Sequence, residues 1–187
     1  MISHRLPARA ALCALLLAAP AAAARAEEPA PYAALSVGAH YGLEYASGYQ
    51  VTLVLEEKSD SGTVWGVVPG VDPAGEVAAR MVQDAKGRMT AFLSADGAAL
   101  ETYQPHNCER VELLCRYTVT DETGAHVEQR FSEFDGTEWT YSILRKTEDG
   151  FVGKRLGSVR YDADGVQMEA EWADLKTGET NSVSRVE

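Results

Sequence analysis

Short turns that end in glycine recur along this chain and constrain its fold more than any other feature. In each, an Asp or Thr side chain can bond nearby backbone, and the glycine can adopt the positive φ that closes a hairpin. They lie at residues 84–87, 121–124, 147–150 and 162–165, with close variants at 95–97, 134–136 and 176–178. From Gly87 onward a turn comes every 10 to 15 residues, apart from one longer interval. This spacing predicts a β-meander.

The segments between these turns alternate between apolar and polar residues. In residues 166–172, for example, every second residue is apolar and the residues between are Gln or Glu. One wet face and one dry face are typical of antiparallel strands over a single core. We expect an all-β fold, an antiparallel up-and-down meander of about 10–12 short strands, which normally closes into a barrel or splits into a two-layer sandwich.

One stretch fits two structures. Asp72 followed by Pro73 is a helix-start signal, and Gly87 is a helix-stop signal. The same residues also alternate at Val77, Ala79 and Met81, and they end in one of the hairpin turns. Because the following segment continues the meander, strand is favoured over helix for residues 73–86, and at most one short helix is expected.

The N-terminus has the layout of a secretory signal peptide. Arg5 and Arg9 precede a short apolar run, and Ala24-Arg25-Ala26 forms an A-x-A cleavage site. We therefore expect residues 1–26 to be removed, leaving residues 27–187 as a single β-meander domain in the periplasm or secreted medium.

The charge balance limits the classes of partner. The leader holds three of the 17 basic residues and none of the 28 acidic ones, so residues 27–187 carry a net charge of −14. Such a chain repels phosphate backbones and anionic lipid, which argues against nucleic-acid or membrane-surface binding. No later stretch is apolar enough for a spanning helix, and charged strand pieces such as residues 153–162 do not suit a lipid-facing barrel.

Two cysteines lie outside the leader, Cys108 and Cys115. A secreted chain usually bridges such a pair. A straight strand would separate their Cα atoms by roughly 23 Å, whereas a disulfide needs at most about 7 Å. The chain must therefore turn back between them, and we expect a structural disulfide that fastens a coil to the strand carrying Cys115.

No signature of a cofactor, metal or catalytic site is present. The haem and redox cysteine motifs are absent, and His106 with the two cysteines lacks the paired spacing of a zinc site. Nucleophile-elbow, phosphate-loop and zinc-protease motifs are absent too. The mature histidines are His40, His106 and His126, and a lone histidine is more often an ordinary residue than a base. We expect no cofactor and no metal, and enzymatic activity is the less favoured interpretation.

Three functions from different classes remain open. The favoured one is a non-catalytic interaction protein, such as an accessory subunit or inhibitor, whose acidic surface meets another envelope or secreted protein, possibly basic. The second is a barrel that binds a small apolar ligand, and the third is an unrecognised hydrolase. The residues singled out as a ligand or partner surface are Trp65, His106, Trp139, Tyr141 and Trp172.

Overall fold

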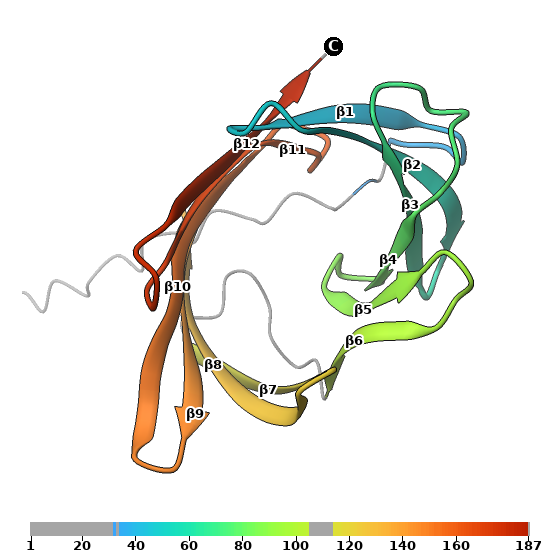
Figure 1. Cartoon of the computed structure of the whole chain (residues 1–187). Helices are drawn as coiled ribbons and strands as arrows, with labels where there is room; N and C mark the ends of the chain where they lie inside the picture. The colour runs from blue at the N-terminus through green and yellow to red at the C-terminus, as the bar shows by residue number, and fades with distance from the viewer. Residues whose placement is uncertain (1–31, 33, 105–113, 187) are drawn as a thin grey trace, which may run out of the picture.

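A computed structural model describes residues 32, 34–104 and 114–186, and these residues form a closed antiparallel barrel of twelve strands (Figure 1). The prediction of an all-β meander of 10–12 strands is confirmed, and the barrel is the form it takes. The strands are β1 His40–Tyr45, β2 Gln50–Ser59, β3 Gly62–Pro69, β4 Ala79–Asp84, β5 Met89–Ser94, β6 Ala99–Gln104, β7 Leu114–Asp121, β8 Gly124–Phe134, β9 Glu138–Thr147, β10 Gly150–Tyr161, β11 Gln167–Asp174 and β12 Thr180–Val186.

The predicted turns close the hairpins in the expected way. Gly87, Gly124 and Gly165 have φ values of 72°, 102° and 76°, which only glycine adopts without strain. At the turn before Gly165, the Asp162 carboxylate accepts hydrogen bonds from the backbone N–H groups of Asp164 and Val166. The aspartate and the glycine therefore act together, one fixing the start of the turn and the other its end.

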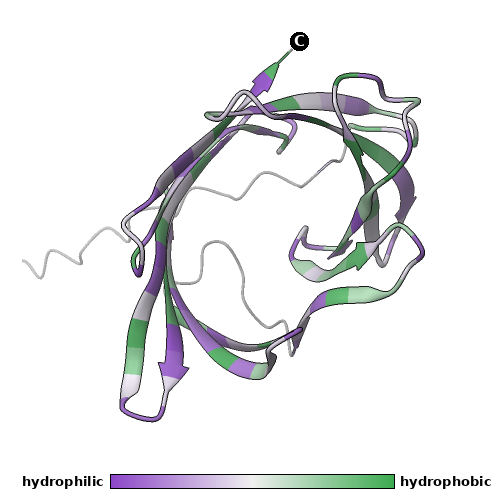
Figure 2. Ribbon diagram, viewed as in Figure 1, coloured by the Kyte–Doolittle hydropathy of each residue, from purple (hydrophilic) through white to green (hydrophobic). Residues whose placement is uncertain are grey.

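Each strand pairs with its neighbours in sequence, and β1 pairs with β12 to close the ring. At that seam Leu43 lies opposite Arg185, and Tyr45 lies opposite Val183. Polar and apolar residues alternate along many of the strands (Figure 2). Closure means that one set of side chains faces the barrel interior and the other faces outward.

The apolar core lies on one side of the barrel interior. Its buried side chains come mainly from β1, β2, β3 and β10 to β12, and include Leu43, Leu53, Leu55, Val159 and Val183. A second, smaller cluster of Cys115, Tyr117 and Val119 lies on β7. Figure 1 shows β7 and β8 across the ring from β1 and β2.

The ambiguous stretch contains strand β4 and no helix. Ala79 and Met81 are opposite Val67 and Trp65 of β3, as the alternating pattern requires. Residues 70–78 form turns and irregular backbone, in which Gly75 lies against Val68. Across the described part of the chain, no helix has the length and apolar character needed to cross a membrane.

Candidate functional site

The inner face of β8 is polar, which is unusual for a strand lining a barrel core. β7 and β8 pair so that Val119, Tyr117 and Cys115 lie opposite His126, Glu128 and Arg130. The β7 side chains are buried, with exposed fractions between 2% and 7%. Cross-strand partners point to the same face of a sheet, so the three polar β8 residues must also face inward.

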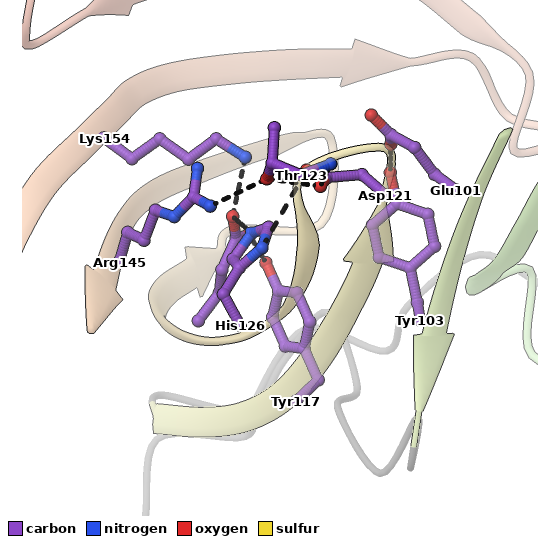
Figure 3. A network of polar contacts seen from close by, with 9 residues as sticks. Glu101, Tyr103, Tyr117, Asp121, Thr123, His126, Arg145 and Lys154 are labelled. Atoms are coloured by element: carbon purple, nitrogen blue, oxygen red, sulfur yellow. Dashed lines mark hydrogen bonds and ion pairs between the residues drawn. The ribbon is translucent and has the colours of Figure 1, made fainter. Parts of the chain in front are cut away.

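Glu128 is the centre of this polar network, because it contacts Tyr117, His126 and Lys154. Figure 3 shows these three partners close together. The Glu128 side chain is only 2% exposed. Oε1 accepts a 2.6 Å hydrogen bond from the Lys154 ammonium and lies 3.2 Å from Nε2 of His126, while Oε2 accepts a 3.1 Å bond from the Tyr117 hydroxyl. A buried carboxylate is tolerated when it has such partners. Burial, and then the negative charge of Glu128, raise the pKa of Tyr117 above its ordinary value.

A β-bulge in β10 brings Lys154 to this carboxylate. Gly153 pairs with Leu144, but the next pair is Arg155 with Ile143, so Lys154 is the extra residue. In a regular strand, two consecutive side chains point to opposite faces of the sheet. A bulge changes the direction of one of them, so that Lys154 and Arg155 can both point inward. Because of the bulge, the ammonium of Lys154 reaches Glu128 while Arg155 keeps the inward register of Ile143.

A smaller polar cluster lies beside the network, at the β7–β8 turn. The Asp121 carboxylate accepts a 2.6 Å bond from the Thr123 hydroxyl, which lowers the pKa of Asp121. Arg145 of β9 donates to the same hydroxyl over 3.3 Å. The His126 ring lies between the two clusters, with Nδ1 3.8 Å from Asp121. Among the described residues, its polar side-chain contacts are to carboxylates rather than to a hydroxyl or thiol that it could activate.

Aromatic side chains line the inner wall farther along the same strands. Trp139 and Tyr141 of β9 stack with their ring centroids 4.6 Å apart. The guanidinium of Arg130 lies 4.9 Å from the Trp139 ring centroid, and that of Arg155 lies 6.0 Å from the Trp172 centroid. These are distances at which a cation is attracted to an aromatic face.

Gly157 has no side chain, and this leaves room for the Tyr141 ring on the inner wall. The glycine lies opposite Tyr141 on one side and Trp172 on the other. A Cβ atom at Gly157 would come within 2.5 Å of the Glu171 carbonyl oxygen and 2.8 Å of the Tyr141 hydroxyl. The absence of a side chain therefore lets two large rings share this part of the wall.

An open hollow of about 520 Å³ lies against β10, β11 and β12. Most of its lining residues have the outward register, including Leu156, Glu171 and Thr180, and Gly157, Trp172 and Asn181 lie between them. The volume is within the range of about 300–1,000 Å³ that is usual for small-molecule sites.

The aromatic residues that the sequence predicts as a binding surface lie in two different parts of the barrel. Trp65 on β3 is 1% exposed and packs edge-on against Tyr32 and Tyr41, so it belongs to the apolar core. Trp139, Tyr141 and Trp172 are half-buried on neighbouring parts of the barrel wall.

Two of the remaining predicted site residues are not among those that the structure describes. His106 and Cys108 lie outside the described residues, so the disulfide with Cys115 stays a prediction. Cys115 itself is on β7 and 6% exposed. The signal peptide, residues 1–26, also lies outside the described residues.

Sequence reasoning missed the polar network, although the sequence contains a signal for it. The turn at residues 121–124 pairs Asp121 directly with Gly124, and that pairing fixes the partner of every residue in the hairpin. Since Tyr117 and Val119 are apolar and face inward, Glu128 and His126 must face inward too. The β8 alternation was masked because its outward residues, Val127 and Phe131, are the apolar ones.

No protein-family model matches the sequence, and no curated protein matches it significantly. Among solved structures, the hypothetical lipoprotein YmcC from Escherichia coli (K12) is similar, with a TM-score of 0.47 and 8% sequence identity over 79% of this chain and 83% of that chain.

Proposed function

We propose that this protein is a non-catalytic binding protein that holds a small, largely apolar molecule against the inner wall of its barrel. The observation that carries the proposal is the half-buried aromatic surface of Trp139, Tyr141 and Trp172. Eight strands give a barrel that side chains can fill, and the diameter grows with strand number. A ring of twelve therefore has a wider interior than an eight-stranded barrel.

The test is the binding of N-phenylnaphthylamine, a neutral apolar probe that fluoresces when it leaves water. We expect saturable binding, with energy transfer from tryptophan to the probe. Trp172→Ala should weaken binding about tenfold, which corresponds to about 1.4 kcal/mol. Binding that does not saturate, or that ignores the substitution, would count against the proposal.

Val71→Ala is a suitable control for this experiment. Val71 is 66% exposed and lies in the segment between β3 and β4, away from the aromatic wall. Its truncation should leave probe affinity unchanged.

A place of action outside the cytoplasm is part of this proposal. It rests on the signal-peptide pattern of residues 1–26. N-terminal sequencing of the protein from envelope or secreted fractions should begin at or near Glu27, and retention of Met1 in that material would contradict it.

A second candidate function is an interaction protein, because apolar residues form a row on the outer face. Leu114 pairs with Phe131, Phe131 with Ser142, and Ser142 with Leu156. The three apolar side chains are 45%, 38% and 53% exposed. Phe131→Ser should then abolish capture of a protein partner from the native envelope while leaving probe binding intact.

A further inference from the structure

The inner wall of β8, β9 and β10 carries a charge opposite to that of the chain. The whole sequence has 28 acidic and 17 basic residues. On this wall, cross-strand register and side-chain contacts assign four basic residues to the interior, Arg130, Arg145, Lys154 and Arg155, against one carboxylate, Glu128. Because the charge of a wall selects the charge of what it binds, this region suits an anion.

Glu128 forms an ion pair with Lys154, whereas Arg145 and Arg155 lie near the carboxylates of Asp121 and Asp174 without forming an ion pair among the described residues. Within the described part of the chain, neither Arg145 nor Arg155 has a carboxylate oxygen within 4.0 Å, and the hydrogen bond of Arg145 is to Thr123. Asp174 lies opposite Arg155 in the register, but its carboxylate accepts hydrogen bonds from the backbone N–H groups of Lys176 and Thr177.

Arg155 also has a donor with no acceptor. Its Nε atom is buried, and no hydrogen-bond partner for it exists among the described residues. Leaving such a donor unsatisfied is unfavourable. A ligand that brings a negatively charged acceptor would recover this energy, and the planar guanidinium matches a carboxylate with two parallel bonds.

The two arginines are close enough to share one anionic group. Arg155 lies opposite Ile143, and Arg145 is two residues farther along β9, which makes the arginines diagonal neighbours. Diagonal pairs in an antiparallel sheet are about 7–8 Å apart at Cα. A carboxylate between the two arginines would draw Arg145 from Thr123 and Arg155 from the Trp172 ring, where they lie without a ligand.

On the side of these arginines away from the β7–β8 turn, the inward residues of β9 are mainly aromatic. Along β9 the inward residues run from Arg145 through Ile143 to Tyr141 and Trp139. Along β10 they run from Arg155 through Gly157 to Val159. A ligand lying along this wall meets Arg145 and Lys154 at one end and the Tyr141 and Trp139 rings toward the other, where Arg130 lies over Trp139.

We infer that the barrel binds an amphipathic carboxylic acid, with the carboxylate between Arg145 and Arg155 and the hydrocarbon part against Tyr141, Trp139 and Trp172. This inference rests on the proposed function and names the ligand class of the same wall. Arg145 and Arg155 are the residues that set specificity for the acid.

The experiment measures displacement of N-phenylnaphthylamine from the mature protein by dodecanoic acid and by dodecanol, which has the same chain without the charge. We expect the acid to bind at least tenfold more tightly than the alcohol. Arg155→Gln and Arg145→Gln should each weaken acid binding about tenfold and leave alcohol binding unchanged. The matched control is Arg160→Gln, on β10 but 51% exposed and paired with Glu169, which should change neither.

Unchanged alcohol binding shows that a variant has folded. If a variant does not fold, the ratio of acid to alcohol affinity in the unchanged protein still shows whether the barrel prefers the acid. Equal affinities for acid and alcohol, or wild-type acid affinity in both Gln variants, would overturn the assignment of an acid while leaving the apolar-ligand function standing. Failure of the probe to bind at all would instead overturn the proposed function.

Discussion

Lys154 places its ammonium nitrogen 2.6 Å from a carboxylate oxygen of Glu128, and that carboxylate is almost completely buried. The pair joins β10 to β8 across β9, so it links three strands of the inner wall. The Lys154 side chain is 36% exposed, which means that the lysine keeps part of its hydration while the glutamate depends on its partners.

Removing the charge of Glu128 should therefore destabilise the barrel. Glu128→Gln keeps the shape but leaves Lys154 without its anion and weakens the bonds from Tyr117 and His126. We expect the free energy of unfolding to fall by about 2 kcal/mol, as for other charged hydrogen bonds. Urea unfolding followed by circular dichroism measures this.

Glu169→Gln is the matched control for that substitution. Glu169 pairs with Arg160 over 2.6 Å, but the two side chains are 43% and 51% exposed. Exposed pairs contribute about 0–1 kcal/mol, so the control should lose less than about 0.5 kcal/mol. Equal losses in the two variants would show that burial of Glu128 has no special energetic role.

Gly157→Ala should destabilise the protein more than the same change at Gly153 of the same strand. A Cβ at Gly157 would collide with the Glu171 carbonyl and the Tyr141 hydroxyl, and the backbone carbonyl cannot rotate away. At Gly153 the close atom, at 2.8 Å, belongs to the flexible and exposed Leu175 side chain. We expect a loss of about 1–3 kcal/mol at Gly157, measured by thermal and urea unfolding, and less at Gly153. The reverse order would be inconsistent with the packing described.

Acid should weaken the contact between Asp162 and β12. Partial burial acts to raise the pKa of Asp162, but hydrogen bonds from Arg185 and from the amides of Val166 and Asp164 outweigh it, so the pKa is lowered. A lowered folded-state pKa gives stability that is present above the unfolded-state pKa of about 3.9 and is lost as pH falls through the folded value.

Asp162→Asn should remove that part of the pH dependence. We expect the variant to be about 1 kcal/mol less stable than the unchanged protein near neutral pH, with the gap narrowing as the pH falls through the lowered pKa of Asp162 and the aspartate takes up its proton. Unfolding in urea at a series of pH values gives the two curves. Parallel curves over the whole range would exclude this role for Asp162.

The predicted disulfide between Cys108 and Cys115 has its own test. Mass analysis under non-reducing conditions should find no free thiol in mature, oxidised protein. Changing both cysteines to Ser should lower the free energy of unfolding by about 2–3 kcal/mol, because a short closed loop restricts the unfolded chain. The unchanged protein after reduction is the control, and it should lose a similar amount. Free thiols in oxidised material would contradict the bridge.

The strands were predictable because the residues that specify each hairpin are close together in the sequence. Asp162 and Gly165 specify a turn through their own side-chain and backbone chemistry, and alternation in the flanking residues needs no knowledge of distant parts of the chain. Closure into a barrel rather than a sandwich depends on pairing between β1 and β12, which neither segment encodes by itself.

The candidate site was harder to predict for a related reason. Glu128 and Arg130 look like solvent-facing residues when β8 is considered alone, since charged side chains are seldom buried. Only pairing with β7 turns them inward. Lys154 reaches Glu128 because of a one-residue irregularity in β10 that leaves no clear mark in the alternation of the sequence.

The seam between β1 and β12 sets the order in which the barrel can form. All the other strand pairs join neighbours in sequence, and each hairpin can form soon after its own residues are present. The seam instead joins residues 42–45 to residues 183–186, and its loop-closure entropy is larger. Until it forms, the sheet has two unpaired edges, which are the parts of a sheet most prone to pair with other chains. Loss of contacts at this seam should thus raise aggregation during refolding more than an equal loss of stability elsewhere.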